Sequence, residues 1–322
     1  MRILITGGAG FIGGHLTESL LKSGDEVIVA DNFSTGSPDN LREVSGRRAE
    51  VVQMDITAEP EKLRELIRES DAVFHLAAAV GVELVVNQPI HTIQTNIDGS
   101  VNTIKFAAEF DKRLFIASTS EVYGKSENEK FTETDDLLIG SPYHARWSYA
   151  CSKLLDEFYL MAYCQSAGLR GTVVRFFNTV GPRQTGKYGM VVPRFVGSAL
   201  KNQPLRIYGD GGQSRCFCHV ADVVRALLLL LKDDRSIGEV FNIGSSRLVT
   251  IRELAELVIS RLHSSSELIH VPYDQAYAKG FEDMRRRKPS TDKIRALTGW
   301  RPEFSLERII DDVAAEMRRR LR

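Results

Sequence analysis

A glycine-rich turn near the start of the chain constrains the fold more than any other feature. The apolar run Arg2–Thr6 leads directly into Gly7-x-x-Gly10-x-x-Gly13, and an amphipathic segment follows at His15–Lys22. A strand joined to a helix through glycines lets a nucleotide pyrophosphate approach the backbone N–H groups at the start of the helix. The spacing differs from the usual G-x-G-x-x-G, so it indicates a variant of the dinucleotide-binding turn. A merely flexible loop is the alternative, and the position of the glycines straight after a strand disfavours it.

Strand-like and helix-like segments alternate through the first half of the chain. The predicted strands are short apolar runs: Arg2–Thr6, Glu26–Asp31, Glu50–Met54, Ala72–His75, Arg113–Ser118 and Arg170–Phe176. Amphipathic segments such as Glu61–Glu69 and Thr95–Phe110 lie between them. This β-α-β alternation predicts an α/β fold with a doubly wound parallel sheet. Ligands of such sheets bind at the carboxyl ends of the strands.

The pattern loosens after Phe176, where turn signals rich in glycine and proline become frequent. The helices predicted there are Val192–Lys201, Val220–Lys232, Ile251–Leu262 and Leu306–Arg319. We therefore expect a dinucleotide-binding domain over residues 1–176. Residues 177–322 should mainly form a smaller, interleaved α/β lobe that binds substrate, with a return to the first domain near residues 220–243.

Composition excludes several classes of partner. Lysine plus arginine and aspartate plus glutamate both number 42, so the zero net charge predicts no nucleic-acid partner. The apolar stretch Ala226–Leu231 is too short to cross a bilayer, which predicts no membrane partner. A strand at the N-terminus leaves no room for a signal peptide. The four cysteines show neither zinc-ligand nor disulfide spacing, so we expect reduced thiols, no metal site and a cytoplasmic protein.

Two aspartates follow predicted strands and suit a bound adenosine. Asp31 closes the second strand a little over twenty residues after the glycine turn, where a carboxylate accepts hydrogen bonds from both ribose hydroxyls and repels a 2′-phosphate. It therefore favours NAD over NADP as cofactor, although an aspartate before Asn32 could also serve only the turn. Asp55 and Ile56 follow the third strand and could hold the adenine ring.

Tyr149 and Lys153 are the strongest catalytic candidates. They lie four residues apart in the helical stretch Ser148–Tyr163, so they share one helix face. An ammonium near a phenol stabilises the phenolate, which could then take a proton from a hydroxyl near neutral pH. Chance could place a Tyr-x-x-x-Lys on any helix. Here, however, a strand ending at Ser118-Thr119-Ser120-Glu121 precedes it, and the Thr119 hydroxyl could bind the same substrate oxygen.

These features together resemble the extended short-chain dehydrogenase/reductase superfamily, specifically its nucleotide-sugar enzymes, over essentially the whole chain. The motifs that carry the resemblance are Thr6–Gly13, His75-Leu76-Ala77-Ala78, Asn96, Ser118–Gly124, Tyr149 with Lys153, Arg175–Gln184 and Gly209-Asp210-Gly211. The resemblance implies a Rossmann domain that holds NAD tightly. It also implies a UDP-sugar that is oxidised at C4 by Tyr149, assisted by Thr119 and Lys153. A homodimer joined through helices near Asn96–Phe110 and Ser148–Tyr163 is expected as well.

The resemblance also implies a set of binding residues. Those expected to bind NAD are Gly7, Gly10, Phe11, Ile12, Gly13, Asp31, Asn32, Asp55, Ile56, Leu76, Ala77, Ala78, Asn96, Ser118, Tyr149 and Lys153. Those expected to bind the nucleotide sugar are Asn178, Val192, Arg194, Tyr208, Arg215 and Arg287.

The fate of the 4-keto sugar depends on residues that differ among these enzymes. Glu121 stands where plain epimerases usually have a small residue, and Thr119–Gly124 resembles the segment of UDP-glucuronic acid decarboxylases and of GDP-mannose 4,6-dehydratases. Far downstream, the Arg287-Lys288-Pro289-Ser290 end of the arginine cluster resembles the arginine motif of the decarboxylases. Arg287 would bind a carboxylate or phosphate, while Ser120 and Glu121 would position the carboxylate and assist protonation of C5. This predicts decarboxylation of UDP-glucuronate to UDP-xylose, or to the 4-keto pentose.

Other reactions stay open at the sequence level. The loop Val80–Pro89 lacks the tyrosine-rich pattern of UDP-xylose synthases, carries Glu83 and is more typical of a 4-epimerase. An isomerase acting on UDP-glucose or UDP-glucuronate is therefore the main alternative to a lyase. A nucleotide-sugar 4,6-dehydratase and a non-catalytic NAD-sensing protein are further alternatives, and the second is disfavoured because both Tyr149 and Lys153 are present. Arg287 could also serve only the diphosphate, and Glu121 could simply cap a turn.

Overall fold

A parallel β-sheet forms the centre of the larger lobe. The computed structural model describes residues 1–42, 44, 48–81, 85, 87–186, 190–272, 284 and 286–320. Within them the sheet has seven strands in the order β11-β6-β5-β4-β1-β2-β3, all parallel. The strands are β1 (Arg2–Thr6), β2 (Glu26–Asp31), β3 (Ala49–Gln53), β4 (Ala72–His75), β5 (Arg113–Thr119), β6 (Gly171–Phe176) and β11 (Glu239–Ile243). The strand order reverses between β1 and β4, where a doubly wound sheet opens a crevice for ligands.

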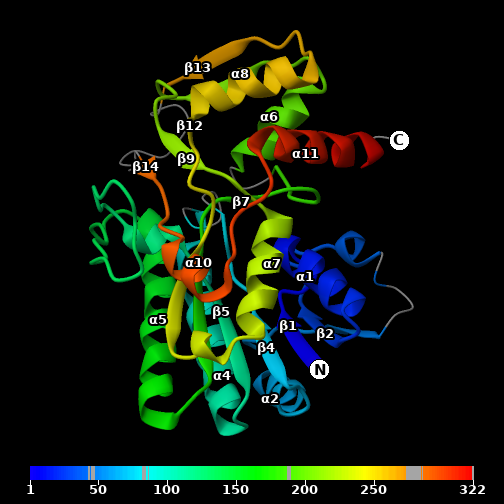
Figure 1. Cartoon of the computed structure of the whole chain (residues 1–322), viewed down its shortest axis with the longest axis vertical. Helices are drawn as coiled ribbons and strands as arrows, with labels where there is room; N and C mark the ends of the chain where they lie inside the picture. The colour runs from blue at the N-terminus through cyan, green and yellow to red at the C-terminus, as the bar shows by residue number, and fades with distance from the viewer. Residues whose placement is uncertain are drawn as a thin grey trace.

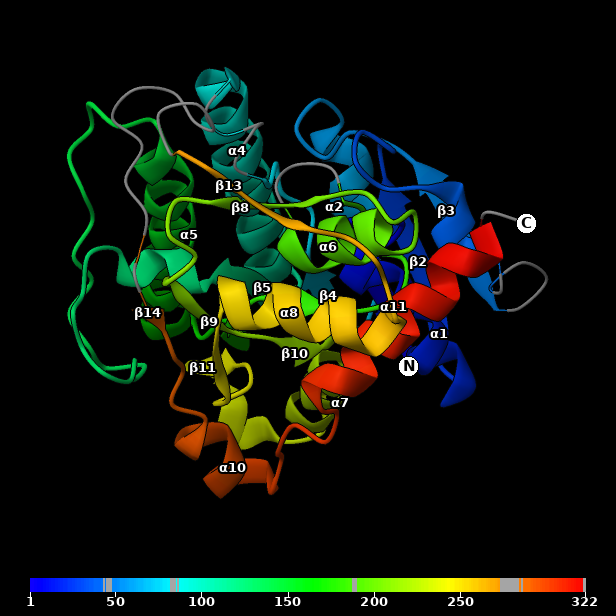
Figure 2. The same cartoon turned by 90° about the horizontal axis from the view of Figure 1, so that it is seen from above.

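Helices cover both faces of this sheet, as Figures 1 and 2 show. One face carries α1 (Phe11–Lys22) and α7 (Val220–Leu231), and the other carries α2 (Pro60–Arg68), α4 (Pro89–Glu109) and α5 (Arg146–Ala167). Alternate residues of β1 explain the two layers: Ile3 and Ile5 pack into the first core, whereas Leu4 packs into the second. The predicted α/β, doubly wound class is confirmed.

A smaller lobe lies above the carboxyl edge of the sheet (Figure 1). It contains α6 (Val191–Ala199), α8 (Ile251–Leu262) and α11 (Leu306–Arg320), which enclose a separate apolar core. Its short strands pair as β8 (Leu205–Tyr208) with β13 (Leu268–Val271), and as β12 (Leu248–Thr250) with β9 (Ser214–Cys216) and β14 (Arg286–Arg287). The sequence pattern predicted the three helices but none of these strands, which are too short to show alternation.

The chain passes between the lobes more than once. After the larger lobe it forms β7 (Thr179–Val180), enters the smaller lobe, and returns through β10 (Cys218–His219) beside β7. The α7 helix and β11 then lie with the first sheet, and α10 (Asp292–Thr298) packs against β11. Trp300 is buried in the first core and donates its indole N–H to the Asp222 carbonyl. The domain boundary that the sequence predicts at residue 176 therefore stays a prediction.

Short elements complete the fold. Three 3-10 turns occur in the described residues, at η1 (Pro38–Leu41), η2 (Ser120–Tyr123) and η4 (Asp234–Ser236). In that same part of the chain, every helix is too short or too polar to cross a membrane. The four cysteines are free thiols, two of them buried.

Candidate active site

A cavity of about 760 Å³ opens between the two lobes at the carboxyl ends of the central strands. Its walls come from segments far apart in the sequence: the glycine turn, the ends of β2, β4 and β5, the start of α5, and the inner side of the smaller lobe. The predicted residues that line it are Gly7, Gly10, Phe11, Ile12, Gly13, Asp31, Asn32, Asp55, Ile56, Leu76, Ala77, Ala78, Ser118, Thr119, Ser120, Glu121, Tyr149, Asn178, Val192, Arg194, Tyr208, Arg215 and Arg287.

The glycine turn has no room for side chains. Gly7 has φ +71°, and a Cβ there would lie 2.7 Å from the backbone nitrogen of Ala77. A Cβ on Gly13 would overlap the carbonyl oxygen of Gly7. Gly10 caps the start of α1, so the first N–H groups of that helix face the cavity end of the turn. This open cradle fits the pyrophosphate of NAD.

Asp31 and Asp55 are held by local hydrogen bonds at the ends of β2 and β3. Asp31 accepts the backbone N–H of Ala9 at 2.9 Å and of Phe33 at 2.8 Å. Burial raises the pKa of Asp31, and these two N–H groups oppose the rise. Each carboxylate oxygen keeps a free lone pair, so the side chain fits a ribose diol.

Asp55 accepts the Thr57 hydroxyl at 2.6 Å and the Asn32 amide at 3.2 Å. The hydrogen bond from the Thr57 hydroxyl is the main reason that the pKa of Asp55 lies below its ordinary value. Asn32 is thus fixed against Asp55 at the cavity wall. The predicted adenine site has a rigid, anionic rim.

Thr119 and Tyr149 meet at the floor of the cavity. Thr119 ends β5, Tyr149 lies in the first turn of α5, and their side chains are hydrogen-bonded. Burial raises the pKa of Tyr149, as does the nearby charge of Glu121, and the Thr119 hydrogen bond lowers it by less. The two hydroxyls that the sequence predicted to share a substrate oxygen therefore lie together.

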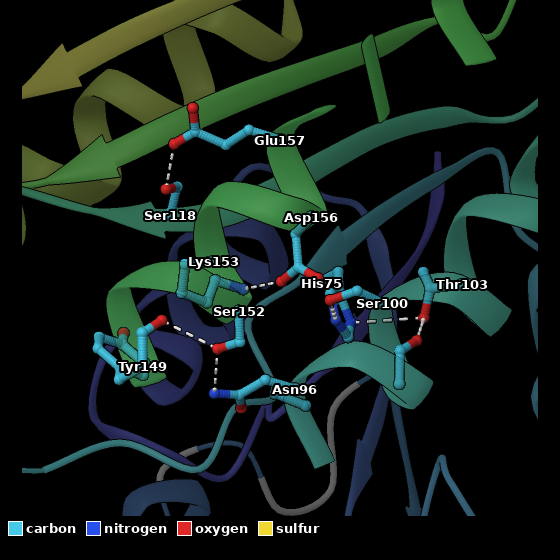
Figure 3. A network of polar contacts seen from close by, with 12 residues as sticks. His75, Asn96, Ser100, Thr103, Ser118, Tyr149, Ser152, Lys153, Asp156 and Glu157 are labelled. Carbon is cyan, nitrogen blue, oxygen red and sulfur yellow. Dashed lines mark hydrogen bonds and ion pairs between the residues drawn. The ribbon is translucent and has the colours of Figure 1, made fainter. Parts of the chain in front are cut away.

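The ammonium of Lys153 points elsewhere. We expected it beside the Tyr149 phenol, but its Nζ lies 2.7 Å from Asp156 Oδ2, and both side chains are 2 % exposed. Among the described residues that line the cavity, Tyr149 is present and Lys153 is not. Residues three apart on a helix meet on its surface, so Asp156 competes with the phenol for the same ammonium. Figure 3 shows this buried pair.

Two other predicted NAD ligands have positioning contacts. The Asn96 side chain accepts the Ala79 N–H at 2.8 Å and donates to Ser152 at 3.2 Å, so it fixes the segment after β4 from behind the cavity. Ser118 lines the cavity but donates its hydroxyl to Glu157. The Asn96–Ser152 and Ser118–Glu157 contacts appear in Figure 3.

Glu121 lies among arginines from three elements. Its two carboxylate oxygens contact Arg287 Nη1 at 2.5 Å and Arg146 Nη2 at 3.1 Å. The pairing of β14 with β9 also sets Arg287 beside Arg215. Burial raises the pKa of Glu121, but Arg287, Arg146 and Arg215 together lower it further, so the group is an anion.

Arg146 was not predicted as a site residue. It lies three residues before Tyr149, at the start of α5, and its side chain is 7 % exposed. An arginine one helical turn ahead of the tyrosine was the available signal, because that spacing places both side chains on one face.

The smaller lobe supplies the far wall. Arg194 stacks over the Tyr208 ring with its guanidinium 4.4 Å from the centroid, which offers a flat, cationic surface to a nucleotide base. Asn178 donates to the Cys216 carbonyl at 3.0 Å and joins β7 to β9. Val192 is fully buried in the lobe's core and lines the cavity at one edge.

Parts of two predicted motifs lie outside the described residues. Glu83 of the loop at residues 80–89 is one such position, whereas Val80, Gly81, Val85 and Gln88 line the cavity. Residues 280–283 and Arg285, ahead of Arg287, are others.

The fold and the cavity define an NAD-binding enzyme, and Tyr149 lies in the wall of that cavity. Residues 3–244 match the NAD dependent epimerase/dehydratase family, and the chain belongs to that family. NAD is the cofactor, as the sequence predicted.

Three relatives bear on the reaction. The chain is 42 % identical to a UDP-N-acetyl-alpha-D-glucosaminuronate decarboxylase of Bacillus cytotoxicus, over 95 % of this chain and 94 % of that protein. It is 35 % identical to UDP-glucuronic acid decarboxylase 1 of Arabidopsis thaliana, over 100 % of this chain and 71 % of that protein. Among solved structures, the UDP-glucose 4-epimerase of Thermotoga maritima with UDP-glucose superposes with a TM-score of 0.89 at 32 % identity, covering 100 % of both chains.

Proposed function

We propose that this protein is an NAD-dependent lyase that decarboxylates a UDP-hexuronate. The observation that carries the proposal is Glu121, held as an anion between Arg146 and Arg287 on the same cavity floor as Tyr149 and Thr119. This cluster places cationic groups beside the point at which the sugar would react. Such groups suit a substrate that carries a carboxylate.

The residues fit a sequence of steps that balances. Once the Tyr149 phenol has lost its own proton to solvent, the phenolate, held by the Thr119 hydrogen bond, takes the proton of the C4 hydroxyl. Bound NAD supplies the oxidation at C4 and the later reduction there. Once C4 is a ketone, the C5 carboxylate belongs to a β-keto acid, so its C–C bond breaks and the electron pair passes into an enolate. CO2 then leaves, and the enolate takes up a proton at C5 from water. Ser120 can donate a hydrogen bond to the departing carboxylate, whereas the ionised Glu121 holds its arginine partners in place and can accept a hydrogen bond from the water that delivers the proton.

The arginines have a defined part in this chemistry. Arg287 can bind the C5 carboxylate through two parallel N–H donors, and Arg146 keeps Glu121 ionised and in place. Their charge also offsets the negative charge that builds up on the enolate oxygen.

The substrate is UDP-glucuronate, giving UDP-xylose, or its 2-acetamido analogue, on which the Bacillus relative acts by name. The Arg194–Tyr208 stack supports a UDP-sugar, since a pyrimidine ring and a guanidinium plane both pack on flat surfaces. The final product is the pentose or its 4-keto form.

A UDP-sugar 4-epimerase is the second candidate. The similarity to the Thermotoga enzyme favours it, because the two chains share the fold over their full length. The arginine cluster around Glu121 favours the decarboxylase over a UDP-glucose 4-epimerase, whose substrate carries no carboxylate. A UDP-glucuronate 4-epimerase would also bind a carboxylate, and it differs from the decarboxylase in releasing no CO2. The nucleotide-sugar 4,6-dehydratase and the NAD-sensing protein stay alternatives.

We also propose a homodimer. The exposed faces of the adjoining helices α4 and α5 carry Ile90, Ile93, Leu155 and Phe158, which are 72 %, 36 %, 47 % and 67 % exposed. Apolar side chains gathered on one face support burial against a second copy. The cytoplasmic location, and the absence of nucleic-acid and membrane partners, stay part of this proposal.

A panel of substrates tests the function. We expect UDP-glucuronate or UDP-N-acetylglucosaminuronate to release CO2 and to yield a UDP-pentose, followed by ¹H NMR. UDP-glucose and UDP-galactose should stay unchanged. Interconversion of the two hexoses without CO2 release from either uronate would establish the epimerase instead.

A further inference from the structure

A buried ion pair lies beneath the cavity and is not used by the chemistry above. Lys153 donates to Asp156 at 2.7 Å, and neither side chain reaches the surface (Figure 3). A buried ammonium requires a counter-charge, because its transfer from water is otherwise too costly. Asp156 is the counter-charge that the described residues place there.

The hydrogen bonds on the far side of Asp156 have a fixed direction. Ser100 of α4 donates to Asp156, and His75 Nε2 lies 3.1 Å from the Ser100 hydroxyl. Since the Ser100 proton is used, His75 must donate through Nε2, and its Nδ1 must accept from Thr6 at 2.8 Å. Burial lowers the pKa of His75 to about 3, so this ring is neutral. Every donor in the chain therefore points toward Asp156, as expected for an anion.

The Lys153–Asp156 pair also contributes to the electrostatic potential at the Tyr149 phenol. The charged groups that face this phenol are Glu121 from η2, with its partners Arg146 and Arg287, and Asp156 from the same helix as Tyr149. Those that face Asp156 are Lys153 and Glu157 of α5, and Glu157 is itself paired with Arg175. Asp156 thus compensates the charge of Lys153, whose ammonium could otherwise stabilise a phenolate.

We propose that Asp156 is a positioning residue that holds Lys153 beneath the cavity and sets how strongly its ammonium acts on NAD and on Tyr149. Any contact from Lys153 to the ribose hydroxyls of NAD must be shared with Asp156. The same ion pair reduces the positive charge available to the phenol. The effect on Tyr149 rests on the proposed function, whereas the effect on NAD binding does not.

The first experiment measures the dissociation constant for NAD by calorimetry, on the full chain freed of bound nucleotide. Asp156→Asn keeps the shape and the hydrogen-bond acceptor of the side chain but removes its charge. Because Lys153 is then no longer shared with an anion, the variant should bind NAD about threefold to tenfold more tightly than the wild type. The same change in a Lys153→Met background should have no effect. Ser100→Ala removes the other donor to Asp156 and leaves it more dependent on Lys153, so NAD should bind no more tightly than in the wild type.

The second experiment follows NAD reduction by the UDP-sugar at 340 nm as a function of pH. Asp156→Asn should move the acidic limb of kcat/KM to lower pH by about half a unit to one unit, because the uncompensated ammonium favours the phenolate. If Asp156 served only packing, NAD binding would be weaker in both the Asp156 and Ser100 variants, and the acidic limb of the kcat/KM profile would not move. That result would overturn the proposal. If no UDP-sugar reduces NAD in the wild type, the proposed function fails, and the calorimetric comparison still decides the role of Asp156.

Discussion

At the scale of the residue, the charge of each site group depends on what surrounds it. Glu121 is buried, which alone would favour its neutral form, yet Arg287 and Arg146 keep its pKa below the ordinary value. Burial and the charge of Glu121 raise the pKa of Tyr149, so its phenol keeps its proton in this state. Charge on the cavity floor is therefore set by which groups the fold brings together.

Glu121→Gln tests the carboxylate while keeping its shape. We expect CO2 release to fall about a hundredfold, which is the usual loss when an acid–base or positioning group is neutralised. The dissociation constant for NAD should stay within twofold, because Glu121 lies away from the glycine turn. Radiometric CO2 release and calorimetry measure the two effects. Unchanged CO2 release would remove Glu121 from the reaction.

Gly13→Ala tests the cradle. The added Cβ would overlap the Gly7 carbonyl, so NAD affinity should fall at least a hundredfold. Gly197→Ala is the matched control, since the nearest atom to its Cβ would be Met317 Sδ at 3.7 Å in an ordinary helix interior. Equal NAD affinity in both variants would show that the turn does not carry the pyrophosphate.

At the scale of the element, helix α5 serves two purposes on two faces. One face buries Lys153, Asp156 and Glu157 against the sheet and α4, and the other exposes Leu155 and Phe158. The residues alternate at helical spacing, so a single helix links the site to the expected dimer surface. Changes at that surface should act on assembly before they act on chemistry.

Phe158→Glu tests the surface. A charge in the middle of the apolar face should convert the dimer to a monomer, because burying an unpaired carboxylate costs several kcal/mol. Size-exclusion chromatography with light scattering gives the mass. Tyr143→Glu is the control, since that side chain is 95 % exposed and lies outside the α4–α5 face. A wild-type protein that is already monomeric would contradict the expectation.

At the scale of the whole molecule, polar contacts join helix α1 of the larger lobe to the segment that links the two lobes. Arg183 reaches from the linking segment after β7 to Glu18 of α1 at 2.6 Å and to His15 at 2.7 Å. His15 also contacts the Pro182 carbonyl at 3.0 Å. Burial, and then the charge of Arg183, lower the pKa of His15 to about 4.

This junction predicts a dependence of stability on pH. His15 binds its proton less readily when folded than at its ordinary pKa of 6.5, so protonation favours the unfolded chain. The contribution of neutral His15 to the free energy of unfolding is fully present above pH 6.5. It is lost as the pH falls from 6.5 toward 4, at up to about 1.4 kcal/mol per pH unit. Urea titrations at pH 7.5 and 5 measure the free energy of unfolding at each pH. The decrease between the two pH values should be smaller in His15→Gln than in the wild type. An equal loss in both proteins would exclude His15.

The strands of the larger lobe could be predicted from the sequence, whereas those of the smaller lobe could not. The strands at Arg2–Thr6, Glu26–Asp31 and Ala72–His75 match the predicted bounds, because buried parallel strands appear as continuous apolar runs. The pairs of short strands in the smaller lobe, and α10, escaped prediction. Two- to four-residue strands carry no periodicity, and their partners lie far away in the chain.

Features that depend on neighbours in the chain can be read from the amino-acid sequence: the β-α-β order, the glycine turn, Asp31 after its strand, and Tyr149 four residues before Lys153. The contact of Glu121 with Arg287, more than a hundred residues away, and with Arg146 is visible in the folded chain alone, because it joins three separate elements. The same holds for the contact of Lys153 with Asp156. Helical spacing allows the Lys153 ammonium to meet either Tyr149 or Asp156. The buried ammonium pairs with Asp156, because that carboxylate supplies the counter-charge and is held in place by Ser100, which contacts His75.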